Sequence, residues 1–494
     1  MLAWVRREIV GHDSFVDTPF GRKRKRYFDY TASGLPFRPI EDAIRDGVLP
    51  YMANTHTESN YTAGYTTSLF EEAHAKIRRA LNAREEDDVV IFTGSGATGA
   101  INKLIGCLGL RIPDILQERF DCASTIPSEA RPLIIRSRME HHSNDLPWRE
   151  TIADTEYVGY DKAGRVDWRQ LEALLSSPEY RDRPMKIGSF SAASNVTGIL
   201  NDTESLSAAM HDGGGLAFFD YAAAGPYVDI DMHPDETGRL RKDAVFLSIH
   251  KFVGGPQSPG LLVANRDLFR TRAPAEPGGG TVLYTSPWEY RYLDNLQNRE
   301  EGGTPPIVQV IRAGLVFDLK AIIGTERMTG LEEYFLERAV QCWRDNPRIE
   351  ILGGDPTCTP HIGIMSLILD GGRLHHNLAA RLLNDLYGIQ VRGGCMCAGT
   401  YGHDLLDIDE AQSKAIRSQL DEGKIGIKPG WVRMSFGPGV SEEDLEILLE
   451  AVPHIAANWR TYAEDYVMNP ATADWHHKSD PLTFPELTLP SPKF

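Results

Sequence analysis

The feature that most restricts the fold of this chain is an alternation of short apolar runs and helix-like stretches in its middle. The runs are bounded by Gly, Pro or charged residues and predict buried strands at 89–93, 132–137, 185–191, 215–220, 244–249 and 260–264. Helical patterns lie between them at 99–110, 167–175 and 205–211. This alternation is typical of a mostly parallel sheet with helices on both faces. Ligands of such sheets bind beyond the carboxyl ends of the strands, so the residues after each strand are the first candidates for a site.

The pattern changes after about residue 306, where a helical stretch leads into a second α+β set of elements. Strands are expected there at 363–369, 389–391 and 431–435, and helices at 308–323, 374–386 and 441–457. The chain has 494 residues, more than one compact domain usually carries. We expect four parts: an N-terminal segment that joins the small domain (1–28), a large domain (29–325), a small α+β domain (326–468) and an extended tail (469–494).

Composition excludes several classes of protein. The net charge of −17 argues against nucleic acid as a partner, because binding a phosphate backbone needs a cationic face. The basic run 22–26 is interpreted as a solvated loop. No stretch is apolar enough to predict a secretory signal or a membrane span. Six cysteines do not make a disulfide framework, which favours a reducing compartment and a cytoplasmic location.

A glycine-rich turn follows the first predicted strand. Its sequence runs from Thr93 through Gly94, Gly96, Ala97 and Thr98 into a helix. Backbone N–H groups at such a helix start, with the helix dipole, favour an anion. The glycine spacing matches neither the dinucleotide fingerprint nor a P-loop, so the turn alone is equally consistent with a plain tight turn.

Two further strand ends carry ionisable residues. Asp220 follows an apolar strand, where a carboxylate could pair with a protonated ring nitrogen or simply cap a helix. Lys251 follows another, and desolvation there would lower its pKa toward a nucleophilic amine. Ser248 and His250 could reach a phosphate. A lysine after a strand is usually a solvated surface residue, but the succession of the glycine turn, the aspartate and the lysine favours a cofactor site.

Two more polar motifs follow predicted strands. In the run 140–144, His141 could stack on a flat aromatic cofactor and relay protons. The pair formed with His142 could also bind metal, but no carboxylate or cysteine with ligand spacing accompanies it. Asn195, in the run 194–198, could hydrogen-bond a phenolic oxygen.

Together these motifs resemble the class V aminotransferase superfamily, most closely its cysteine desulfurase and selenocysteine lyase branch. The resemblance extends from the motif at 27–33 to that at 432–435, and is most specific at 140–144 and 248–251. It implies fold type I of the pyridoxal phosphate (PLP)-dependent transferases, with a seven-stranded, mostly parallel sheet and a smaller α+β domain. It also implies a homodimer with shared active sites, an amino-acid substrate and a sulfur-acceptor protein as a further partner.

The resemblance further implies roles for individual residues. Lys251 would hold PLP as a Schiff base and move the Cα proton of the substrate. Arg433 would hold the substrate carboxylate, a role suited to a bidentate guanidinium. The remaining assignments are Asp220 at the pyridine nitrogen, His141 on the ring, Asn195 at the ring oxygen, Ala97, Thr98, Ser248 and His250 at the phosphate, Thr304 at the partner's phosphate, and His56, within 54–58, at the partner's substrate site.

The sulfur chemistry depends on the motif 391–399. The family places a nucleophilic cysteine five residues after its arginine, here Cys397, whose thiolate would become a persulfide. Cys395 stands where the nearest relatives usually have histidine, and this pair also resembles the amino-terminal domain of molybdenum cofactor sulfurases. Two small buried hydrophobic residues are the alternative interpretation. Ala223 replaces a glutamine that the family often has, which puts strict desulfurase activity in doubt.

The leading hypothesis is therefore cleavage of the C–S or C–Se bond of cysteine or a related amino acid, giving alanine and a persulfide on Cys397. A different class V PLP reaction (transamination, epimerisation or β-elimination on an unusual amino acid) is the second. A sulfur carrier without catalysis is the third, and the presence of Lys251, Asp220 and His141 argues against it.

Overall fold

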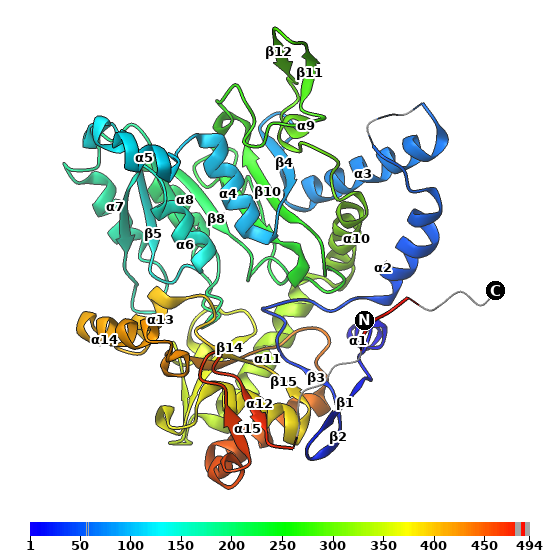
Figure 1. Cartoon of the computed structure of the whole chain (residues 1–494), viewed down its shortest axis with the longest axis vertical. Helices are drawn as coiled ribbons and strands as arrows, with labels where there is room; N and C mark the ends of the chain where they lie inside the picture. Colours follow the sequence, from blue (N-terminus) through cyan, green and yellow to red (C-terminus); the bar gives the residue numbers. More distant parts are fainter. Residues whose placement is uncertain (56, 58, 480–485, 490–494) are drawn as a thin grey trace.

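The computed structural model describes residues 1–55, 57, 59–479 and 486–489. A seven-stranded sheet forms the centre of the larger part of the molecule (Figure 1). Across the sheet the strands are β4 (Asp88–Thr93), β10 (Gly260–Asn265), β9 (Ala244–Ser248), β8 (Leu216–Asp220), β7 (Lys186–Ser191), β5 (Leu133–Ser137) and β6 (Asp154–Val158). Strand β10 is antiparallel to both neighbours, and the other pairings are parallel. The predicted mostly parallel α/β sheet is confirmed.

Helices cover both faces of this sheet, which explains why its strands are continuous apolar runs. Strand β4 is buried along its whole length. Because successive side chains point to opposite faces, Val90 packs in one core and Val89 in another. The core around Val89 includes α4 (Gly96–Leu108) and Trp148 of α6 (His142–Arg149). The opposite core is covered by α7 (Trp168–Ser176), α8 (Thr203–Asp212) and α10 (Ile307–Ile323), and α3 (Tyr61–Ala80) packs against α10.

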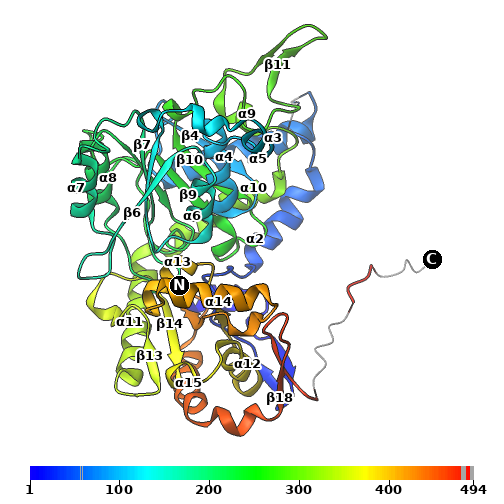
Figure 2. The same cartoon turned by 60° about the vertical axis from the view of Figure 1, so that its left-hand side comes forward.

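A second, antiparallel sheet lies below the first in Figure 2. Its strands, in order, are β13 (Ile349–Ile351), β14 (Ile364–Leu369), β17 (Trp431–Ser435) and β16 (Arg392–Gly394). The helices α11 (Thr325–Trp343), α12 (His376–Tyr387) and α15 (Glu442–Ala463) pack with it. The N-terminal strand β3 (Arg26–Tyr27) pairs with β15 (Ile389–Gln390), so the start of the chain lies against this second part.

Two of the elements missed by the sequence prediction have weak apolar patterns. Strand β6 is at the sheet edge, and only Val158 in it is fully buried. Helix α14 (Glu410–Asp421) has no buried residue among its described positions. The segment Trp475–His477, within the expected tail, pairs as β19 with β18 (Tyr466–Met468). In the described parts of the chain, no helix is both long and apolar enough to cross a membrane.

Candidate active site

A cavity of about 250 Å³ lies where the carboxyl ends of the central strands meet the second part of the chain. Most of the residues predicted from the sequence line it: Ala97, Thr98, His141, Asn195, Asp220, Ser248, His250, Lys251, Cys397 and Arg433. The amine, the glycine turn and the strand-end carboxylate, on which the PLP hypothesis depends, therefore share one cavity.

The glycine turn between β4 and α4 forms one wall. Gly94 and Gly96 have positive φ values of 48° and 58°, a conformation that glycine adopts without strain. A Cβ atom at Gly96 would lie 2.7 Å from Ser248 Oγ and 2.9 Å from His250 Cε1, so only glycine fits. Ser248 Oγ accepts a hydrogen bond of 2.9 Å from the Ala97 amide. The first turn of α4 thus surrounds a place suited to a phosphate, together with the hydroxyls of Thr98 and Ser248 and the imidazole of His250.

Lys251 and Asp220 are the ionisable pair of the cavity. Burial lowers the pKa of Lys251 from 10.5 to about 8, while the carboxylate of Asp220 opposes this shift. Burial raises the pKa of Asp220, which accepts a hydrogen bond of 2.8 Å from the Ala222 amide. At neutral pH, an appreciable fraction of the Lys251 side chain is therefore the neutral amine that can attack an aldehyde.

His141 is the N-cap residue of α6 and is held in one protonation state. Its Nδ1 atom accepts a hydrogen bond of 3.1 Å from the Ser143 amide, so the proton of the neutral ring is on Nε2. Burial lowers the pKa of His141 to about 3, and nearby Lys251 adds to this shift. The Ser143 hydroxyl also lies 2.6 Å from Thr98 Oγ1, which connects the imidazole to the glycine turn.

Two arginines and one carboxylate form the opposite wall. Asp29 accepts a hydrogen bond of 3.1 Å from Arg433 and another of 3.0 Å from Arg392. Arg433 is buried, whereas Arg392 is about half exposed. Two cations share one carboxylate, so this wall carries excess positive charge suited to an anionic substrate group.

The residues fit a PLP ring together with an amino-acid substrate. Within the described structure, the buried atoms Asn195 Oδ1 and Arg433 Nε have no hydrogen-bond partner. Buried polar atoms without partners are costly, and both of these residues line the cavity. An aromatic ring with a polar rim, and a substrate carboxylate, would supply partners of the right kind.

The segment with Cys397 closes the cavity from the side of the second sheet. Met396 and Cys397 have φ values of 53° and 55°, two consecutive left-handed residues that are not glycine. Such residues cost about 1–3 kcal/mol each and need contacts that hold them. One contact is the hydrogen bond of 2.8 Å from Asn195 Nδ2 to the Met396 carbonyl oxygen. Cys397 is exposed and Cys395 is partly buried, so the pair does not behave as two buried hydrophobic residues.

One predicted residue, Thr304, does not line this cavity, and another, His56, cannot be compared with it. In the described part of the chain, Thr304 lies apart from it and accepts a hydrogen bond of 3.3 Å from Asn54 Nδ2. His56 lies outside the described residues. The structure adds cavity residues to which sequence reasoning gave no role: Thr31, Ala32, Ser95, Ser143, Ala222, Arg392 and Met396, with Asp29 behind the two arginines. Asp29 and Arg392 are within motifs quoted for the family resemblance, which was the available signal.

The family model for aminotransferase class V matches residues 26–448, most of the chain. The chain belongs to the aminotransferase class V family. Members of this family are PLP enzymes, which agrees with the character of the cavity.

Relatives of this class V protein include a probable cysteine desulfurase of Streptomyces coelicolor, 27% identical over 75% of this chain and 83% of the relative. A probable cysteine desulfurase of Vibrio cholerae is 26% identical over 86% and 92% of the two chains. The apo structure of a cysteine desulfurase from Thermococcus onnurineus superposes with a TM-score of 0.72 at 22% identity, covering 92% of this chain and 98% of that one. A cysteine desulfurase structure from Escherichia coli gives a TM-score of 0.68 at 21% identity, with coverages of 93% and 99%. These likenesses confirm the fold type I architecture of the class V protein.

Proposed function

We propose that the protein is a PLP-dependent cysteine desulfurase, which converts cysteine or a related sulfur or selenium amino acid to alanine and leaves a persulfide on Cys397. The observation that carries this proposal is that Cys397 and Lys251 line the same cavity as Asp220 and the glycine turn. The names of the relatives support the same chemistry.

In this proposal the cofactor is held by residues at both ends of the cavity. Its phosphate would be held at Ala97, Thr98, Ser248 and His250. Asp220 would pair with the ring nitrogen, His141 would stack on the ring and Asn195 would contact the ring oxygen. PLP, when bound, supplies an electron sink that labilises the bonds at Cα of an amino acid and permits cleavage at Cβ.

The residues of the chain bind the substrate and move its protons. Arg433 holds the substrate carboxylate, and the Lys251 amine transfers the Cα proton. The Cys397 thiolate attacks the substrate sulfur, so that one S–S bond forms while the C–S bond breaks. The carbon is reduced and takes up a proton to give alanine, and the two sulfur atoms remain as the persulfide.

A homodimer is part of this proposal. Thr304 lies next to Asn54, apart from the cavity of its own chain within the described residues, and is suited to reach the phosphate of a second copy. His56, as the family resemblance implies, would contact the partner's substrate. The sulfur-acceptor protein and the cytoplasmic location stay predictions.

The decisive experiment is the Cys397→Ser variant incubated with cysteine. We expect it to keep its bound cofactor and to lose alanine and persulfide formation. The matched control is Cys358→Ser, which replaces another exposed cysteine. Undiminished turnover of the amino acid by Cys397→Ser would instead favour a different class V reaction, such as transamination, epimerisation or β-elimination.

A further inference from the structure

The second histidine of the pair, His142, contacts the Cys397 turn and not the cofactor cavity. Its backbone amide donates a hydrogen bond of 2.7 Å to the carbonyl oxygen of Cys397. Its ring atom Nε2 accepts a hydrogen bond of 3.0 Å from the Gly399 amide. One residue of α6 therefore holds the cysteine turn on both sides of Ala398.

The ring of His142 acts as a cap for the helix that follows the cysteine. Helix α13 (Gly399–Leu405) begins at Gly399, and the structure describes no side-chain capping bond from its N-cap residue, Ala398. The first amides of a helix have no partner within the helix, and alanine cannot supply one. A Cβ atom at Gly399 would lie 3.1 Å from His142 Nε2, so glycine allows the imidazole to approach closely.

This cap holds a turn that is strained. Met396 and Cys397 both have left-handed backbone conformations, which persist only where surrounding contacts determine them. The His142 amide fixes the carbonyl group of Cys397, and the Asn195 side chain fixes the carbonyl group of Met396. Loss of the imidazole contact to the Gly399 amide, the one of these contacts that depends on the His142 side chain, would loosen the start of α13 and let the adjoining turn move the Cys397 thiol.

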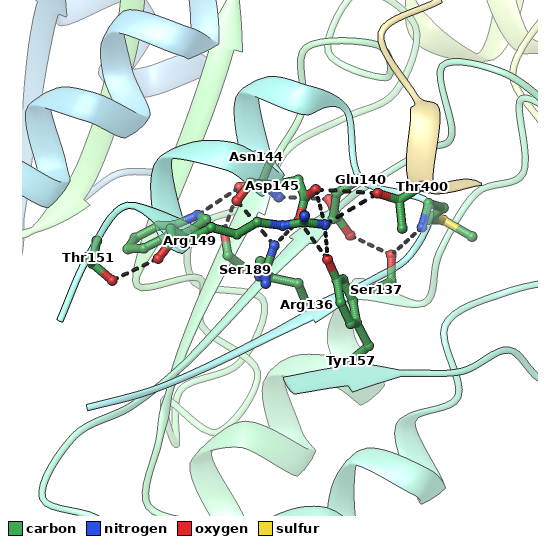
Figure 3. A network of polar contacts seen from close by, with 12 residues as sticks. Arg136, Ser137, Glu140, Asn144, Asp145, Arg149, Thr151, Tyr157, Ser189 and Thr400 are labelled. Atoms are coloured by element: carbon green, nitrogen blue, oxygen red, sulfur yellow. Dashed lines mark hydrogen bonds and ion pairs between the residues drawn. The ribbon is translucent and has the colours of Figure 1, made fainter. Parts of the chain in front are cut away.

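Helix α6, which supports these contacts, is anchored by a network of polar side chains. Figure 3 shows Asp145, on α6, in a network with Arg136, Arg149 and Tyr157. Asp145 and Arg136 are buried and form an ion pair. The same network reaches the cysteine segment, because Thr400 lies 3.4 Å from both Asp145 Oδ2 and Arg149 Nη2 (Figure 3).

We propose that His142 is a positioning residue for sulfur transfer: by capping α13 and fixing the left-handed turn, it holds the Cys397 thiol where it can reach the substrate sulfur. This inference rests on the proposed desulfurase function. A displacement of the thiol by about 1 Å is expected to slow its attack on the order of a hundredfold.

The protonation state of His142 is consistent with this role. An Nε2 atom that accepts a hydrogen bond cannot carry a proton. Burial lowers the pKa of His142, and the cations Lys428 and Arg149 lower it further. The imidazole therefore stays an acceptor at neutral pH.

The first arm of the test uses cofactor-free protein and hydrogen–deuterium exchange of the segment 395–401. We expect His142→Leu to speed exchange at least about tenfold, because the Gly399 amide loses its acceptor. His142→Gln, whose amide oxygen can take the place of Nε2, should restore slow exchange. The matched control is His375→Leu, because His375 also caps a helix. Its ring accepts a hydrogen bond of 3.1 Å from the Asn377 amide at the start of α12.

The second arm uses cofactor-loaded protein and cysteine. For His142→Leu we expect an unchanged cofactor spectrum, an unchanged spectral response to cysteine and a KM within about twofold, with kcat for alanine at least tenfold lower. His142→Gln should recover most of kcat, and His375→Leu should match the wild type. The inference is overturned if His142→Leu keeps the exchange rate or the kcat of the wild type. It is also overturned if His142→Gln is as impaired as His142→Leu. Failure of the wild type to form alanine would instead reject the proposed function, and the exchange arm would still decide the capping contact.

Discussion

The guanidinium of Arg433 lies 3.1 Å from the carboxylate of Asp29, in the wall of the cavity. It also donates a hydrogen bond of 3.1 Å to the carbonyl oxygen of Asn195. Among the described residues its Nε atom has no partner. Two protein contacts thus fix the plane of the guanidinium, and the Nε–H group is left for a ligand.

Replacement of Arg433 by lysine should weaken substrate binding. A lysine keeps the charge but cannot bond Asp29, the Asn195 carbonyl and a substrate carboxylate in one fixed geometry. We expect KM for cysteine to rise about tenfold, equivalent to about 1.4 kcal/mol, with the cofactor spectrum unchanged. Steady-state kinetics measure this. Arg392→Lys is the control, and we expect it to change KM less than about threefold because Arg392 is half exposed. Equal changes of KM in the two variants would contradict the assignment of Arg433 to the substrate carboxylate.

The rate at which cofactor-free protein takes up PLP should depend on the protonation of Lys251. Its pKa is lowered to about 8, so the neutral, reactive amine increases as pH rises and is dominant above about pH 8. We expect the covalent incorporation rate to rise from pH 6 to pH 8 and then to level off, as measured by borohydride reduction and mass spectrometry.

Lys320 provides an internal control for the same experiment. Burial also lowers its pKa to about 8, but its amine is hydrogen-bonded to the Gly225 and Val228 carbonyl oxygens. The cofactor mass should appear on Lys251 and not on Lys320. Labelling of both lysines would mean that a lowered pKa, and not the cavity, selects the amine.

Gly96→Ala should remove cofactor binding while the fold survives. The new methyl group would lie 2.7 Å from Ser248 Oγ and 2.9 Å from His250 Cε1, and the positive φ adds strain. We expect PLP affinity to fall more than tenfold, measured by titration of cofactor-free protein. The control is Gly330→Ala in α11, where, apart from the adjacent backbone of the helix, the described structure has no heavy atom within 4 Å of the added carbon. That change should raise stability by up to about 1 kcal/mol and leave PLP affinity unaltered.

The projecting hairpin of β11 (Val282–Thr285) and β12 (Tyr290–Tyr292) should contribute to a homodimer (Figures 1 and 2). Leu283 is 60% exposed and Trp288, at its tip, is 90% exposed. A two-stranded hairpin is marginal alone, and exposed apolar groups of this size usually mark a contact surface. We expect wild-type protein to sediment as a dimer and the double variant Leu283→Ser, Trp288→Ser to dissociate more readily. Ile115→Ser, at another exposed apolar residue, should not change the dimer; a monomeric wild type would refute the homodimer.

The local sequence pattern predicted the central sheet and the site residues that follow its strands. Strands β4 and β9 were predictable because their apolar runs are buried on both faces. Asp220 and Lys251 could be found because each follows such a run, and the carboxyl ends of parallel strands meet at one edge. Strand β6 and helix α14 were missed because partial exposure leaves them without a clear apolar period.

The sequence by itself therefore determined which strands form the sheet and which side chains stand at their ends, since hydrophobic periodicity acts over a few residues. Only the tertiary structure decided that Asp29 joins Arg392 and Arg433, and that His142 holds the Cys397 turn. These contacts join residues hundreds of positions apart. They depend on how the two sheets pack against each other, and no local pattern records that packing.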